Sequence, residues 1–138
     1  PKVILTDDSG LCVDKLNGEP GVYTARYAGE NATQMENITK LLENMKQYEK
    51  IEDRTCKFIT VLTAILSNGE KLVARGECRG IISKNIGKLG GLTYAPVFIP
   101  IGFDKPMSDM EEEEFRKVHN HRDIAMNKIV QELKKRNI

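Results

Sequence analysis

The middle of the chain carries the clearest pattern of apolar and polar positions. Between residues 55 and 66 apolar side chains occupy both alternating sets of positions, which predicts a central β-strand covered on both sides. Asn68-Gly69 follows and is a strong signal for a tight hairpin turn. The more polar, alternating segment 72–82 is then expected to return as the partner strand.

Two further segments have the three- and four-residue spacing of helices. Apolar residues recur at this spacing from Met35 to Met45, and Asn31 with Gln34 predicts a capping box before them. A second capping box is expected at Ser108 and Glu111, followed by a helical stripe that continues to the basic carboxyl end. A short strand is expected at residues 97–100, where proline closes it.

The opening segment places acidic side chains directly after an apolar run. Residues 3–5 predict a buried strand, and Asp7, Asp8, Ser9 and Gly10 predict a tight turn at its carboxyl end, where α/β sheets bind ligands. Two adjacent carboxylates suit a bound cation, but the same residues are common in plain turns. The local pattern favours the turn and leaves the metal site open.

Composition narrows the class of protein. The 138 residues suit one domain, and 21 basic against 20 acidic residues give a net charge of +1, dispersed along the chain. This dispersed charge is not typical of a protein that binds duplex DNA, and the sequence contains no apolar run long enough to span a membrane. The 3 cysteines are widely spaced, which predicts reduced thiols in a cytoplasmic protein. Because the chain begins at Pro1 rather than at methionine, we expect its amino terminus to be incomplete.

Several motifs in a fixed order resemble one known family. They are Asp7-Asp8-Ser9-Gly10-Leu11, then Asn17-Gly18-x-Pro20-Gly21-Val22-Tyr23-x-Ala25-Arg26-Tyr27-Ala28-Gly29, then Gly90-Gly91-x-x-Tyr94-x-Pro96-x-Phe98-x-Pro100, and finally His121-Arg122. This order resembles the inosine triphosphate pyrophosphatase family, which hydrolyses non-standard purine nucleoside triphosphates. The match covers nearly all of residues 1–138, which are expected to form one domain of this type.

The resemblance implies both a fold and an activity. The fold is α/β, with an elongated mixed β-sheet flanked by helices and two lobes on either side of a nucleotide cleft. The activity is the Mg²⁺-dependent hydrolysis of ITP, dITP or XTP to the monophosphate and pyrophosphate. A homodimer is implied as well, with no nucleic-acid or membrane partner.

The family motifs also imply roles for individual residues. Asp8 matches the carboxylate that serves the metal ion and the attacking water, with Asp7 as a second metal candidate. Ser9 matches a serine that contacts the nucleotide. His121 and Arg122 match the pair that reads the purine, since donors suit a six-oxo group and face the six-amino group of adenine unfavourably.

The substrate loop departs from the family pattern. The family has Gly-Phe-Gly-Tyr-Asp-Pro, whereas this chain has Gly91-Leu92-Thr93-Tyr94-Ala95-Pro96. Leu92 replaces the aromatic side chain that would stack on the base, Thr93 replaces a glycine, and Ala95 replaces an acid. Tyr94 is retained, and all four residues remain candidate substrate contacts.

Other family features are altered or fall outside the chain. The family lysine aligns with Arg116, or with Lys117 if the spacing differs by one residue, and Asn120 replaces a serine. The family's opening phosphate loop and its metal-binding glutamate would precede Pro1. We therefore expect this chain to be weakly active or inactive.

Two alternatives to an active nucleoside triphosphate pyrophosphatase can be compared with these observations. A degenerate family member that binds a nucleotide or a protein without chemistry is favoured by Leu92 and Ala95. The intact Asp7-Asp8-Ser9-Gly10 motif favours the enzyme. A phosphatase with an aspartate nucleophile is excluded locally, because that chemistry requires Asp-x-Asp after its strand.

Overall fold

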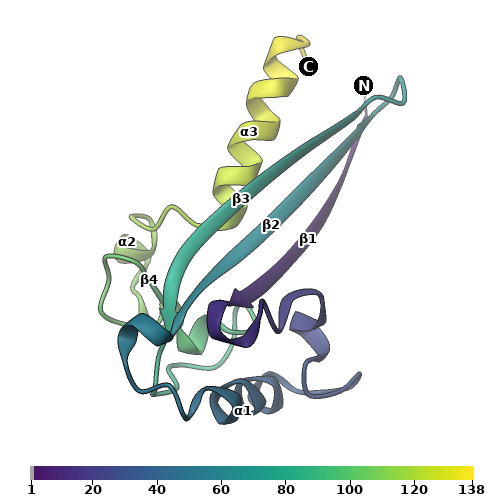
Figure 1. The fold of residues 1–138 in the computed structure, drawn as a ribbon. Coiled ribbons are helices and arrows are strands. Elements are labelled where there is room, and N and C mark those ends of the chain that lie inside the picture. Colours follow the sequence, from purple (N-terminus) through teal and green to yellow (C-terminus); the bar gives the residue numbers. More distant parts are fainter. Residues whose placement is uncertain (1) are drawn as a thin grey trace. The chain divides into compact units, whose positions relative to one another are not determined.

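A computed structural model describes residues 2–138, and its strands form one sheet in the order β1-β2-β3-β4. The strands are β1 (Val3–Val13), β2 (Thr55–Leu66), β3 (Lys71–Ile82) and β4 (Phe98–Pro100). The helices are α1 (Gln34–Met45), α2 (Glu112–Phe115) and α3 (His121–Lys135). The sheet and the helices together make a mixed α/β structure (Figure 1), and the α/β class expected from the sequence is confirmed.

The central hairpin forms where the sequence predicts it, but β2 is less covered than expected. β2 lies between β1 and β3, and Gly69 adopts the positive φ of 88° that a tight turn after Asn68 requires. Side chains of β2 alternate between buried and half-buried, so one face of the strand is in the core and the other is only partly covered. At its far end β3 pairs antiparallel with β4, with Ile81 opposite Ile99.

The predicted acidic turn does not exist. β1 runs without interruption from Val3 to Val13, so the acidic residues lie inside the strand rather than beyond its end. Ile4 and Leu5, expected to be buried, are 61% and 46% exposed. Polar residues can occupy a strand whose faces reach solvent, and the amino-terminal half of β1 is such a strand.

Both predicted capping boxes are displaced or absent. The N-cap of α1 is Thr33, whose hydroxyl accepts from the Glu36 amide while the Glu36 carboxylate accepts from the Thr33 amide. This reciprocal Thr-x-x-Glu pair replaces the expected Asn31–Gln34 pair. The Ser108 hydroxyl makes no hydrogen bond, and α2 begins only at Glu112. The expected single carboxyl-terminal helix is therefore two helices, α2 and α3.

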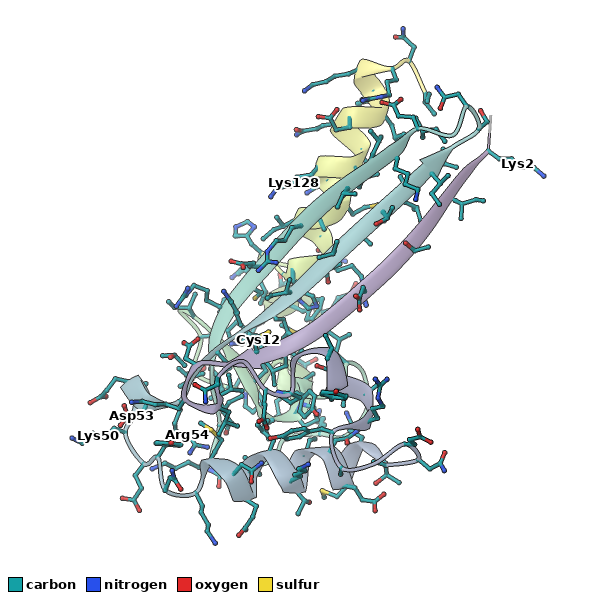
Figure 2. All side chains as sticks on the ribbon, turned by 45° about the vertical axis from the view of Figure 1, so that its right-hand side comes forward. Lys2, Cys12, Lys50, Asp53, Arg54 and Lys128 are labelled. Atoms are coloured by element: carbon teal, nitrogen blue, oxygen red, sulfur yellow. The ribbon has the colours of Figure 1, made fainter. Side chains whose placement is uncertain are left out.

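The chain divides into two compact units, which are described separately. Unit 1 consists of Pro1–Ser9, Phe58–Cys78 and His119–Ile138, and unit 2 of Gly10–Lys57 and Arg79–Val118. In unit 1, α3 packs against β2 and β3. The core there comprises Leu62, Ala64, Leu66, Leu72, Ala74, Ala125 and Ile129. Lys128 on α3 also donates a hydrogen bond of 2.8 Å to the carbonyl of Arg75 in β3 (Figure 2).

Unit 2 is organised around a buried arginine. Arg54, 4% exposed and labelled in Figure 2, donates four hydrogen bonds to main-chain carbonyl groups. The acceptors are Met45, Tyr48, Ile82 and Ser83, at 2.7 to 3.2 Å. The guanidinium therefore joins the carboxyl end of α1 to the end of β3 and satisfies carbonyls that a helix end leaves open.

Candidate functional site

The amino-terminal end of α3 carries two of the candidate residues. The Asn120 side chain accepts a hydrogen bond of 2.9 Å from the Asp123 amide, which caps the helix and places His121 and Arg122 in its first turn. Gly76 in β3 lies against this turn, and a Cβ at Gly76 would be 2.0 Å from the His121 carbonyl oxygen. The missing side chain of Gly76 thus allows the helix end to approach the strand.

Arg122 and Asp7 form an ion pair although they are 115 residues apart in the sequence. The Nε of Arg122 donates to the Oδ2 of Asp7 at 2.8 Å. Both side chains are partly exposed, 46% for Arg122 and 36% for Asp7. The structure therefore brings the acidic motif of β1 and the late His121-Arg122 motif together within unit 1.

A chain of hydrogen bonds continues from Asp7 into the sheet. The Ser9 hydroxyl donates to the Oδ1 of Asp7 at 2.7 Å, and its oxygen lies 2.8 Å from the Thr60 hydroxyl. A serine hydroxyl has a single hydrogen. Because that hydrogen is directed at Asp7, Thr60 must be the donor to Ser9. Thr60 is fully buried in β2, so the series of hydrogen bonds begins in the core.

His121 is buried and lacks hydrogen-bond partners. It is 1% exposed, its ring stacks on Phe58 with centroids 4.9 Å apart, and neither of its nitrogens has a partner. Burial, with a smaller contribution from the positive charge of Arg122, lowers the pKa of His121 to about 4. The imidazole is therefore neutral at pH 7, with one donor and one acceptor nitrogen unused.

Asp8 lies apart from this cluster, on the opposite face of β1. Successive strand residues point to opposite faces, and Asp7 and Ser9 are hydrogen bonded on one of them. Asp8, whose side chain is exposed, therefore points away from Asp7, Ser9 and Arg122. In unit 1, the carboxylate that contacts Arg122 is therefore that of Asp7 and not that of Asp8.

The two carboxylates do not fit a chelating magnesium pair. Both oxygens of Asp7 already accept hydrogen bonds, and Asp8 points the other way. Within residues 2–138 there is also no cluster of three His, Cys, Asp or Glu side chains that could hold a metal ion. Magnesium is often held by one carboxylate together with substrate phosphates and waters. Asp8, whose carboxylate is exposed, fits that more limited role.

Unit 2 contains the loop of residues 90–95, which is attached to α1 by one glutamine. The Gln34 side chain accepts from the amide of Gly90 at 2.7 Å and approaches carbonyls of Gly90, Leu92 and Thr93 at 3.1 to 3.3 Å. Gly90 and Gly91 adopt φ values of 115° and 67°, which L side chains rarely adopt. The loop therefore has a defined shape, with Leu92 and Thr93 partly exposed.

Three other candidate contacts in unit 2 differ in their access to a ligand. Tyr94 is fully buried, and its hydroxyl donates to the Thr24 carbonyl at 2.9 Å. Ala95 is 4% exposed, so the side chains of both residues belong to the core rather than to a ligand surface. Arg116 is exposed and pairs with Glu112 at 2.7 Å.

The sequence prediction missed residues that support the site rather than form its surface. Thr60 gave a signal, because it is a hydroxyl on an otherwise apolar strand face. Gln34 was interpreted only as a capping residue, although its amide holds the loop. Phe58 and Gly76 gave no signal, since only the fold brings them to His121.

Among the helices of residues 2–138, none is long and apolar enough to cross a membrane.

Comparisons with known proteins agree with the motif order. A dITP/XTP pyrophosphatase of Clostridium perfringens is 39% identical over 132 residues, which cover 96% of this chain and 64% of the relative. One from Christiangramia forsetii is 41% identical over 129 residues, covering 94% of this chain and 65% of the relative. The chain thus spans a little less than two thirds of the length of these curated relatives.

Solved structures and a family model give the same assignment. The Ham1 protein of Staphylococcus aureus aligns with a TM-score of 0.86 at 36% identity, covering 98% of this chain and 68% of that one. A HAM1 protein from Coxiella burnetii aligns with a TM-score of 0.83 at 30% identity, covering 96% and 68%. The model of the Ham1 family matches residues 1–132. This chain therefore belongs to the Ham1 family.

Proposed function

We propose that the protein is a nucleoside triphosphate diphosphatase that hydrolyses ITP, dITP or XTP to the monophosphate and pyrophosphate. Two relatives of this chain carry the name dITP/XTP pyrophosphatase, and the acidic and His121-Arg122 motifs are both present. Residues 1–138 would supply the purine-reading part of the site and one carboxylate of the reaction centre.

The unpaired hydrogen-bonding groups at the amino terminus of α3 are the main support for this proposal. Arg122 uses Nε for Asp7, which leaves its two Nη groups for a ligand oxygen. His121 beside it is a neutral imidazole with both nitrogens unpaired, although a buried polar group without a partner costs about 1–3 kcal/mol. Such a cost is characteristic of a site that gains its partner on binding.

These groups would distinguish six-oxo from six-amino purines. Donors from Arg122 and His121 suit the oxygen at position six of hypoxanthine or xanthine. The amino group of adenine would place donor against donor, and polar groups left unpaired by the wrong base give strong discrimination. Because His121 is buried, its ring would have to shift from Phe58 to reach a base, whereas Arg122 is already exposed.

Asp8 is the candidate for the chemical step. Its exposed carboxylate could accept the proton of an attacking water, which is general-base catalysis. The same group is the candidate ligand for Mg²⁺, which when bound neutralises phosphate charge and lowers the pKa of a bound water. Arg116 and Lys117, both exposed, are candidates for neutralising the triphosphate, and Leu92, Thr93 and the loop backbone for contacting the nucleotide.

A second candidate function is nucleotide binding without turnover. It is supported by Ala95, which replaces the family acid, and by Leu92, which replaces the family aromatic side chain. For the same reasons we expect turnover by this chain to be slow, below about one per second.

A thermal-shift screen separates these candidates. The melting temperature is measured with ITP, XTP, dITP and ATP, with and without Mg²⁺, and pyrophosphate release is followed in parallel. Selective binding raises the melting temperature by mass action, so we expect shifts with the six-oxo purines and little shift with ATP. Mg²⁺-dependent release that disappears in Asp8→Asn supports the enzyme, whereas binding without release supports the binding module. No shift with any six-oxo purine would contradict both.

We also propose that the protein is a cytoplasmic homodimer. Cys12, Cys56 and Cys78 are all free thiols, which suits a reducing compartment. Light scattering of the purified chain at several concentrations measures the assembly, and a mass of one chain throughout would contradict the dimer.

A further inference from the structure

The chain of hydrogen bonds Thr60–Ser9–Asp7–Arg122 has a direction. Thr60 donates to Ser9, Ser9 donates to Asp7, and Asp7 accepts from Arg122. It begins at a fully buried hydroxyl and ends at a guanidinium whose side chain is 46% exposed. A carboxylate with both oxygens hydrogen bonded has little freedom to rotate, so the buried end of the chain fixes the orientation of Asp7.

Arg122 occupies a position where a cation is otherwise unfavourable. It is in the first turn of α3, where the partial positive charge of the helix end repels a guanidinium. The carboxylate of Asp7, on a different element, offsets that repulsion at 2.8 Å. Without Asp7 the long Arg122 side chain would lose its one charged partner among residues 2–138 and sample other rotamers.

The mode of contact determines what Arg122 can offer to a ligand. A carboxylate paired with both Nη groups would occupy the fork that recognises oxo and phosphate oxygens. Asp7 instead takes Nε, and within the described chain Nη1 and Nη2 of Arg122 have no acceptor. The guanidinium is thus held by its inner nitrogen with its outer face available.

We propose that Asp7 is a positioning residue that holds Arg122 ready to bind the six-oxo purine, and that it is not a metal ligand. This inference rests on the proposed function for the identity of the ligand. It does not rest on it for the geometry, because the Asp7–Arg122 contact can be measured without any nucleotide. Asp7 acts only through Arg122, and Thr60 and Ser9 act only through Asp7.

The first experiment tests the contact in the ligand-free protein. In ¹H–¹⁵N spectra of arginine side chains, the Nε–H signal of Arg122 is identified by its loss in Arg122→Lys. We expect Asp7→Asn to shift this signal and increase its exchange with solvent, and Thr60→Val to do so more weakly. Glu77→Gln removes the acceptor of the Arg75 pair in the same unit and should leave the Arg122 signal unchanged. An unchanged Arg122 signal in a folded Asp7→Asn variant would overturn the proposal, whatever the protein binds.

The second experiment tests the consequence for recognition. We expect Asp7→Asn to weaken ITP binding about tenfold while leaving the weak ATP binding unchanged. The reason is that a charge-assisted hydrogen bond from Arg122 to Asp7 orients the guanidinium that contacts the purine. Arg122→Lys should weaken ITP binding at least as much. The double variant should weaken it no further, because both changes remove the same Asp7–Arg122 contact. Additive losses, or an equal loss for ITP and ATP, would overturn the positioning role.

Magnesium distinguishes positioning from metal binding. If Asp7 only positions Arg122, the Mg²⁺ concentration for half-maximal stabilisation by ITP should be the same in Asp7→Asn and in the unaltered chain. A several-fold increase in that concentration would identify Asp7 as a metal ligand and overturn the proposal. If the unaltered chain binds no six-oxo purine, the proposed function fails, while the Nε–H measurement still decides whether Asp7 holds Arg122.

Discussion

At the level of single residues, Asn120 shows how a substitution within a family motif keeps its structural role. Its side-chain oxygen accepts the Asp123 amide at 2.9 Å and so begins α3 immediately before His121. Serine, which the resembled family has at this place, caps helices about as well as asparagine. We therefore expect serine in place of Asn120 to begin the helix at the same residue and to keep Arg122 in its first turn.

Removal of this cap should weaken the protein measurably. We expect Asn120→Ala to lower the free energy of unfolding by about 1 kcal/mol, since one amide of the first turn loses its acceptor. Asn120→Ser is the matched control and should cost only a few tenths of a kcal/mol. Urea unfolding followed by circular dichroism measures both. Equal losses in the two variants would show that the Asn120 side chain does not act as a cap.

At the level of elements, Gly76 controls how closely α3 approaches β3. A Cβ added there would lie 2.0 Å from the His121 carbonyl oxygen and 2.8 Å from the Ala125 amide nitrogen. Both are backbone atoms, so no side-chain rotation can relieve the overlap. The helix end that carries His121 and Arg122 would have to move away from the sheet.

We expect Gly76→Ala to destabilise the protein by about 3 kcal/mol or more, because overpacking against backbone cannot relax locally. Lys71→Ala, at an exposed position of the same strand, should change stability by less than about 0.5 kcal/mol. Chemical denaturation measures both variants. A Gly76→Ala variant as stable as Lys71→Ala would mean that α3 does not rest on β3 as described.

For the whole molecule, local patterns predicted the elements better than the contacts that form the site. The β2–β3 hairpin was predictable because alternation and Asn68-Gly69 act over a few residues. The strand conformation of Asp7 and Asp8 was not predictable, because these residue types favour turns and only the pairing of β1 with its neighbour holds them in a strand. The Asp7–Arg122 pair, 115 residues apart, was implied only through the family motifs and not by any local pattern.

The free energy of unfolding of the whole chain should decrease in two steps as the pH falls, and these steps adjoin near pH 4. The folded-state pKa of His121, about 4, is below the ordinary 6.5, so the unfolded chain binds the extra proton between these values and stability falls as the pH falls. The loss from pH 7 to pH 4 should be about 3 kcal/mol. The pKa values of Glu70 and Glu132 are lowered by Arg136, so their contribution is lost only below about pH 4.5. We expect His121→Phe to abolish the upper transition in pH-dependent urea unfolding and to keep the lower one, and an unchanged upper transition would show that His121 is not buried in its neutral form.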